Sequence, residues 1–115
     1  MGDMNGSHED LTSKKCKPCE GGTPPLGEKE IREQLLKAPG WSYVKGEIVK
    51  SFAFKNFRHT MAFVNAVANI ADEEDHHPEL EVGYKTCKVR YSTHSIKGIS
   101  ENDFICAAKV NALLK

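Results

Sequence analysis

One helix in the middle of the chain restricts the possible folds more than any other feature. Its apolar residues recur with the 3.6-residue period of an α-helix and form one continuous stripe: Phe57, Met61, Val64, Val67, Ala68 and Ala71. Asn56 is a good N-cap, and Pro78 stops any helix that precedes it. We therefore predict a helix from residue 57 to about residue 72, whose stripe packs against another layer of structure.

Strand-like alternation flanks this helix on both sides. Before it, the pattern predicts strands over residues 41–44 and 48–54, joined by a turn. After it, apolar and polar residues alternate over 80–84 and again over 89–94. The second region could be one long strand, but we interpret it as a hairpin that turns near residues 85–86.

A helix at each end completes the order. Residues 28–38 have helical apolar spacing, and Ser100 with Asp103 has the S-x-x-D form that starts a helix running to about Leu114. This last helix is apolar over a wide arc, which suits a subunit contact. The order α-β-β-α-β-β-α indicates an α+β domain, with a four-stranded antiparallel sheet and helices packed on one face.

The start of the chain differs from the rest. Residues 1–26 are rich in Gly, Ser, Lys, Asp and Pro and show no apolar period. This composition predicts a flexible leader whose side chains stay largely exposed, with the exception of Leu26. Residues 27–115 then form the folded domain, a length that suits a single core.

The four cysteines give only a weak indication of a metal. Cys16 and Cys19 form one CxxC motif, whereas a structural zinc site needs four ligands and usually a second close pair. Cys87 and Cys106 lie within apolar patterns and are expected as small core residues. We therefore predict no metal site.

Composition limits the classes of partner. The 16 basic and 16 acidic residues balance to a formal net charge of 0, so nothing electrostatic favours nucleic acid or an anionic membrane. No apolar run approaches the roughly 18 residues of a membrane span. The first residues contain no apolar signal region, so we expect a soluble, cytoplasmic protein, with a nuclear or organellar location left open.

Three histidines are the candidates for chemistry. His76 and His77 follow four acids, residues 72–75, at the end of the central helix, and His94 ends the last predicted strand. Because histidine changes its charge near neutral pH, such a cluster can transfer protons. Acids at a helix C-terminus oppose the helix dipole, which favours a functional helix end. The alternative is a helix end with solvated charges. Strand parity places His94 away from the apolar row.

These residues resemble those of the pterin-4a-carbinolamine dehydratases. The motifs are Asp75-His76-His77-Pro78, Ser92-Thr93-His94 and Ser100-Glu101-Asn102-Asp103, and the resemblance covers roughly Trp41 to Leu114. It implies four antiparallel strands with helices on one face. It also implies an enzyme that converts 4a-hydroxytetrahydropterin to quinonoid dihydropterin and water, in tetrahydrobiopterin recycling after an aromatic amino acid hydroxylase, without a metal or dissociable cofactor.

The resemblance also implies a set of site residues. Two imidazoles suit the reaction, because loss of the C4a hydroxyl needs an acid and loss of the N5 proton needs a base. A neighbouring carboxylate such as Asp72 can hold a histidine ring in one tautomer. The catalytic residues would be His76, His77 and His94. The implied substrate-binding residues are Asp72, Asp103, Trp41, Ser92 and Thr93.

The family resemblance bears on partners as well. It implies a pterin substrate and a homotetramer or homodimer. Animal members of the family also act as dimerisation cofactors of a homeodomain transcription factor, which makes a binding module the alternative function. A further alternative is an unrelated histidine-rich metal protein, which would need acidic or cysteine ligands close to the histidines.

Overall fold

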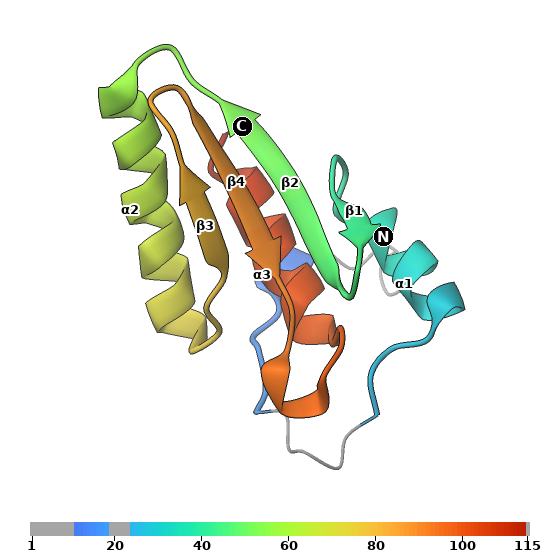
Figure 1. Ribbon diagram of the computed structural model, residues 1–115. Coiled ribbons are helices and arrows are strands. Elements are labelled where there is room, and N and C mark those ends of the chain that lie inside the picture. The colour runs from blue at the N-terminus through green and yellow to red at the C-terminus, as the bar shows by residue number, and fades with distance from the viewer. Residues whose placement is uncertain (1–10, 19–23, 115) are drawn as a thin grey trace, which may run out of the picture.

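The computed structural model describes residues 11–18 and 24–114 of the 115-residue chain (Figure 1). Its elements, in order, are the 3-10 helix η1 (Leu11–Ser13), α1 (Glu28–Leu35), β1 (Ser42–Val44), β2 (Glu47–Ala53), α2 (Phe57–Glu74), β3 (Glu79–Val82), β4 (Thr86–Tyr91), the 3-10 helix η2 (His94–Ile96) and α3 (Glu101–Ala112). Apart from the two 3-10 helices, this is the predicted α-β-β-α-β-β-α order.

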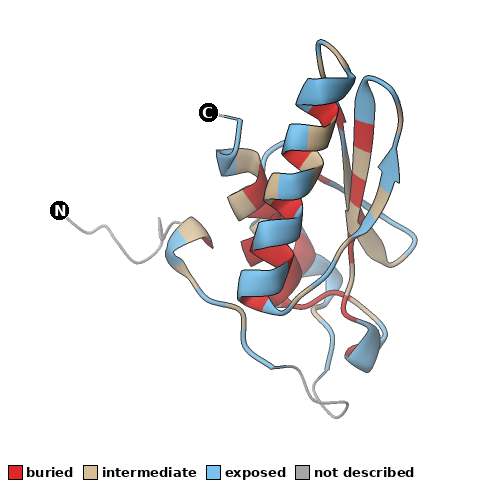
Figure 2. Cartoon of the chain, turned by 90° about the vertical axis from the view of Figure 1, so that its left-hand side faces the viewer, coloured by how far each residue is buried: buried red, intermediate tan, exposed pale blue. Residues whose placement is uncertain are grey.

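The four strands form one antiparallel sheet in the order β1-β2-β4-β3. The two hairpins meet through β2 and β4, where Ile48 lies opposite Tyr91 and Phe52 lies opposite Cys87. Helices α2 and α3 cover one face of the sheet (Figures 1 and 2). The predicted α+β architecture is confirmed.

The two hairpin turns lie where the sequence predicts them, and the first follows from local chemistry. Val44 pairs with Glu47, so the first turn has two residues, Lys45 and Gly46, with φ of 51° and 83°. Positive φ at both positions gives the turn that best matches the twist of the strands, and glycine adopts it without steric cost. The second hairpin turns at residues 83–85, so the predicted split near residues 85–86 is confirmed.

The helix starts are also as predicted. The Asn56 side chain accepts a hydrogen bond from the backbone N–H of His59 at 2.9 Å, which caps α2. Ser100 and Asp103 form a capping box at the start of α3. Helix α2 runs two residues beyond the predicted end and stops at Asp75, which has a left-handed backbone with φ of 52°.

Helix α3 is buried on nearly all sides. Phe104, Cys106 and Val110 are fully buried, and Cys87 in β4 is buried against the same core, as predicted for both cysteines. A helix that is apolar over such a wide arc needs cover on two sides. The sheet covers one side of α3, and the N-terminal segment covers the other (Figure 2).

That cover corrects one prediction about the N-terminal segment. The leader was expected to bury little, but Leu11 is only 2% exposed and belongs to the core. A subunit contact through the apolar arc of α3 stays a prediction, and Leu113 and Leu114 at the end of that arc are exposed in the single chain. A homotetramer or homodimer therefore stays a prediction. Residues 1–10 and 19–23, including Cys19, lie outside the described residues.

No helix among residues 11–18 and 24–114 is long and apolar enough to cross a bilayer. The helices instead bury their apolar residues against the sheet and one another, and this core includes Trp41, Phe63 and Phe104.

The burial of Leu11 predicts a measurable loss of stability when its side chain is shortened. Leu11→Ala should lower the free energy of unfolding by about 2 kcal/mol, because it leaves a cavity beside α3. Leu36→Ala is the matched control, since Leu36 is 86% exposed. Urea unfolding measures both, and equal midpoints for the two variants would contradict the docked position of the N-terminal segment.

Candidate active site

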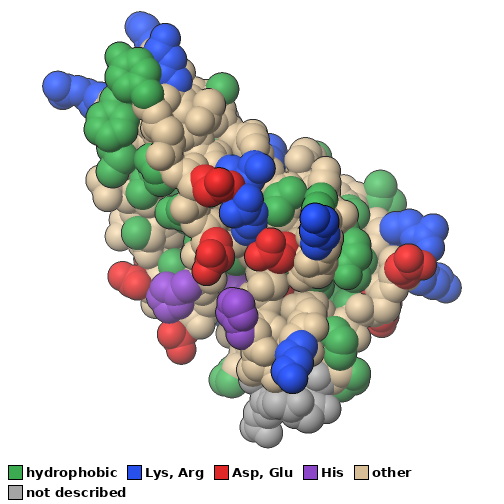
Figure 3. All heavy atoms as spheres, viewed as in Figure 1, with side chains coloured by type: hydrophobic (Ala, Val, Ile, Leu, Met, Phe, Trp, Pro, Cys, Tyr) green, Lys and Arg blue, Asp and Glu red, His purple; other side chains and the backbone are tan. Residues whose placement is uncertain are grey.

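A cleft of about 620 Å³ opens where the end of α2, the connection from β4 to η2 and the N-terminal segment meet. Its size suits a small-molecule ligand. Histidine and acidic side chains gather on this end of the molecule (Figure 3). The lining residues are Cys16, Lys17, Pro18, Glu73, Glu74, Asp75, His76, His77, Ser92, Thr93, His94, Ser95 and Asn102.

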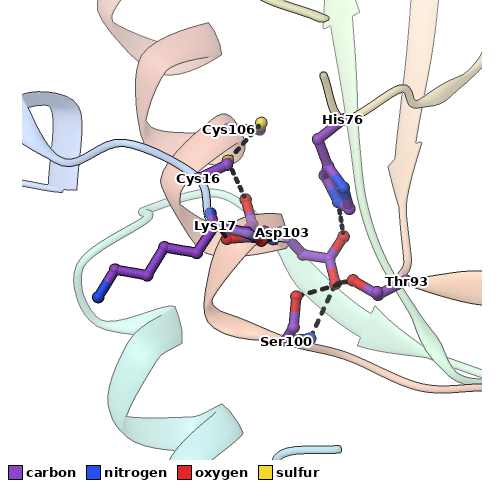
Figure 4. Close-up of polar contacts among 8 residues, drawn as sticks. Cys16, Lys17, His76, Thr93, Ser100, Asp103 and Cys106 are labelled. Carbon is purple, nitrogen blue, oxygen red and sulfur yellow. Dashed lines mark hydrogen bonds and ion pairs between the residues drawn. The ribbon is translucent and has the colours of Figure 1, made fainter. Parts of the chain in front are cut away.

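His76 is the best-fixed side chain in the cleft. The left-handed turn at Asp75 ends α2, and the backbone N–H of His76 donates to the Ala71 carbonyl at 3.1 Å. The imidazole Nε2 lies 2.6 Å from Asp103 Oδ1 (Figure 4). The ring also stacks on Tyr91 with centroids 5.8 Å apart and planes 5° apart. Backbone, carboxylate and aromatic ring together hold the imidazole in one orientation.

Asp103 is fully buried, yet its carboxylate is well supplied with donors. Its Oδ2 accepts from the Ser100 backbone N–H at 2.9 Å and from the Thr93 hydroxyl at 2.8 Å. Since the Thr93 proton goes to Asp103, the Ser100 hydroxyl donates to Thr93 across 2.7 Å. The positive end of the α3 dipole adds to this support. Asp103 therefore has both predicted roles, in the capping box and beside the histidine.

The Asp103 contact determines which nitrogen of His76 is available. An ionised carboxylate only accepts hydrogen bonds, so Nε2 of His76 carries the proton between them. Nδ1 is then the nitrogen left to exchange a proton at the cleft. Burial by itself lowers the pKa of His76, but the hydrogen bond and charge of Asp103 outweigh it, with a smaller contribution from Asp75. The net pKa lies above the ordinary value, which favours the imidazolium.

His77 and His94 are both exposed in the cleft. Nε2 of His77 lies 3.6 Å from Asp72 Oδ1, but these side chains are 60% and 83% exposed, so water screens the pair. His94 was predicted in a strand, whereas β4 ends at Tyr91 and His94 begins η2. The strand stops early because Thr93 turns to pair with Gly98 and to reach Asp103.

The remaining predicted site residues divide into two groups. Ser92 and Thr93 line the cleft, whereas Trp41, Asp72 and Asp103 are not among the described residues that do. Trp41 is buried in the core, where its indole N–H donates to Asn111 at 3.0 Å. Its ring centroid lies 6.0 Å from that of Tyr91, and Tyr91 in turn stacks on His76. Contact between Trp41 and a pterin stays a prediction.

Sequence reasoning missed the contribution of the N-terminal segment. Cys16, Lys17 and Pro18 line the cleft, and Glu74 and Asn102 hold them there. The CxxC motif was the one indication that this region has a defined role. The described residues include no group of three or more histidine, cysteine, aspartate or glutamate side chains arranged to bind a metal.

Comparison with known proteins identifies the family. The family model described as pterin 4 alpha carbinolamine dehydratase matches residues 24–113. The chain belongs to this family. The resemblance carried by the histidine motifs is therefore confirmed, and the match covers all the strands and the three α-helices.

Relatives with this fold have been named for two kinds of activity. Proteins from Nitrosospira multiformis and Nitrosomonas eutropha, both named provisionally as pterin-4-alpha-carbinolamine dehydratases, are 54% and 59% identical. The alignments cover 97% and 91% of this chain, and 99% and 94% of the relatives. A crystal structure described as a transcriptional coactivator/pterin dehydratase, from Brucella melitensis, is 36% identical with a TM-score of 0.76, and the match covers 79% of this chain and 99% of that one.

A second solved structure is more distant. It is described as a pterin dehydratase-like protein that serves as a RuBisCO assembly factor in the alpha-carboxysome. It is 27% identical with a TM-score of 0.57, and the match covers 65% of this chain and 89% of that one. The same fold has therefore been described both as an enzyme and as an assembly factor.

The contact with Asp103 predicts that the pKa of His76 depends on the charge of this carboxylate. Asp103→Asn keeps the shape of the side chain but removes the charge, so burial then dominates and the pKa of His76 should fall below its wild-type value. NMR titration of the imidazole signals measures this. Asp72→Asn is the control, because Asp72 lies beside His77 instead. Superimposable His76 curves for wild type and Asp103→Asn would contradict the assigned cause.

Proposed function

We propose that this chain dehydrates 4a-hydroxytetrahydropterin to quinonoid dihydropterin, with histidines as the acid and the base. The observation that supports this most directly is the part-buried His76–Asp103 pair, which presents an oriented imidazole to a cleft that two further histidines also line. The family membership supplies the class of substrate.

The reaction needs two proton transfers and no change of oxidation state. The bond from C4a to the hydroxyl oxygen breaks, and that oxygen leaves as water after it takes a proton from an acid. N5 gives its proton to a base, and the C4a–N5 double bond forms. Each proton transfer by a positioned side chain accelerates such a reaction by roughly 10²–10⁴-fold.

The environments of the histidines suggest how these tasks divide. The raised pKa of His76 makes its protonated form more abundant than that of an ordinary histidine at the same pH, so we assign His76 to the departing hydroxyl. Asp103 orients the ring and stabilises the imidazolium, as buried carboxylates do beside catalytic histidines. His94 comes from a different connection and is assigned to the N5 proton. His77 is assigned to holding the pterin.

A binding role is the second candidate function. The Brucella structure is described both as a transcriptional coactivator and as a pterin dehydratase, so the two activities are associated in a relative of this fold. A role of this chain as a dimerisation cofactor would use an outer surface and leave the cleft free. Recycling of tetrahydrobiopterin for an aromatic amino acid hydroxylase is the physiological setting that we propose for the dehydratase.

One assay tests the enzymatic proposal. Synthetic 4a-hydroxytetrahydropterin is mixed with the purified chain, and quinonoid dihydropterin is followed by its absorbance, with and without a chelator. We expect a rate above the spontaneous rate that the chelator does not change. A rate equal to the spontaneous one would refute the dehydratase, and loss of activity with chelator would favour the metal-protein alternative.

Alanine variants test the division of roles. His76→Ala and His94→Ala should each lower kcat by about 10²-fold or more, because each removes a proton-transfer group. His77→Ala should raise KM more than it lowers kcat, as expected when substrate and transition state lose the same contact. His59→Ala is the control, since His59 lies on α2 outside this cleft. Full activity in all three cleft variants would place the site elsewhere.

A further inference from the structure

One wall of the cleft is formed by residues that precede the part of the chain matched by the family model. That model begins at residue 24, whereas Cys16, Lys17 and Pro18 line the cleft. The Brucella structure is matched over 99% of its length but over only 79% of this chain. The Nitrosospira relative is matched over 97% of this chain, so its similarity includes the N-terminal segment. The wall is therefore an addition to the common fold that some relatives share.

Asn102 fastens this wall to the first turn of α3. The backbone N–H of Lys17 donates to Asn102 Oδ1 at 3.0 Å, and Asn102 Nδ2 donates to the Lys17 carbonyl at 2.6 Å. The Asn102 amide thus pairs with both backbone groups of one residue, as a neighbouring strand would. Asn102 is buried, so water competes little for these two bonds.

Glu74 fastens the wall to the last turn of α2. Its Oε1 accepts from the Cys16 backbone N–H at 2.9 Å, and its Oε2 lies 3.6 Å from Lys109 Nζ. Burial by itself raises the pKa of Glu74, but the bond from Cys16 and the charges of Lys109 and Lys15 lower it below the ordinary value. Glu74 is therefore an ionised, buried acceptor for the segment.

Further contacts extend the anchoring toward the start of the segment. Lys109 Nζ donates to the Thr12 carbonyl at 2.8 Å, and Lys14 forms an ion pair with Glu101 at 2.6 Å. Leu11 closes the apolar side of α3. The segment is thus held along its whole described length by the two helices whose ends carry His76 and Asp103.

The chemistry of the wall suits binding rather than proton transfer. The neighbouring Cys106 thiol, at 3.6 Å, and burial both raise the pKa of Cys16, so Cys16 stays a neutral thiol. Pro18 has no ionisable group. The Lys17 side chain extends away from the His76–Asp103 pair (Figure 4). None of the three is placed to exchange a proton with the reacting atoms.

We propose that residues 16–18 form a substrate-binding wall of the pterin cleft, held in place by Asn102 and Glu74. The proposal rests on the dehydratase function and adds a binding surface that the family model does not contain. Because the wall contacts the pterin without taking part in proton transfer, its loss weakens binding of substrate and transition state alike.

The test releases the segment without changing any residue of the cleft. Leu11→Asp places a charge in the core beside α3, and Leu36→Asp places the same charge at an exposed site. For Leu11→Asp we expect KM to rise about tenfold while kcat stays within about twofold of wild type. Thermal unfolding verifies that the body of the protein remains folded. Lys109→Met, which removes the bond to the Thr12 carbonyl and does not change a cleft-lining residue, replaces Leu11→Asp if that variant does not fold.

The outcomes separate this proposal from the dehydratase proposal. If the wild-type chain is active and the folded Leu11→Asp variant has an unchanged KM, the proposed wall is wrong and the dehydratase proposal stands. A lower KM in Leu11→Asp means that the segment obstructs the cleft, and a loss confined to kcat means that the segment acts on the chemical step. Each of these two results also contradicts the proposed binding wall. If the wild-type chain lacks dehydratase activity, calorimetry of dihydropterin binding tests the wall instead. Weaker binding by Leu11→Asp than by Leu36→Asp supports the wall. Equal binding by the two variants contradicts it.

Discussion

The hydrogen bond between His76 and Asp103 is the contact on which the arrangement of the cleft depends. It joins His76, the second residue after α2, to the first turn of α3 across 2.6 Å. A fully buried carboxylate is costly unless donors surround it, and Ser100, Thr93 and His76 supply them. The bond from Ser100 caps the start of α3, the bond from Thr93 fixes the chain just after β4, and the bond from His76 orients its imidazole. The fold and the site therefore depend on the same interactions.

Helix α3 connects this contact to the rest of the molecule. The sheet lies on one side of α3 and the N-terminal segment on the other (Figure 2). Because Leu11 covers the second side, the segment that follows it is brought to the mouth of the cleft, where Cys16 and Lys17 meet Glu74 and Asn102. The packing of the N-terminal segment on α3 thus both buries this helix and adds residues to the cleft.

Patterns that act over short distances predicted most of the fold. The period of α2, the alternation of the strands and the Ser100–Asp103 capping box involve neighbours within one or two turns, so local propensity decides them. The segment around Leu11 could not be predicted in this way, because one apolar residue in a polar stretch has no period. Its burial depends on α3, more than eighty residues later in the chain.

The sequence by itself determined the order of the elements, the family and the three histidines of the cleft. Only the tertiary structure decided how the side chains pair. Asp72 was the carboxylate expected to hold a histidine ring, yet Asp103 is the partner of His76, 27 residues away, while Asp72 lies in solvent beside His77. Trp41 packs beside Tyr91 in the core and is not among the described residues that line the cleft. The physical reason is that burial and hydrogen bonding between distant segments depend on how the helices pack, which no local period encodes.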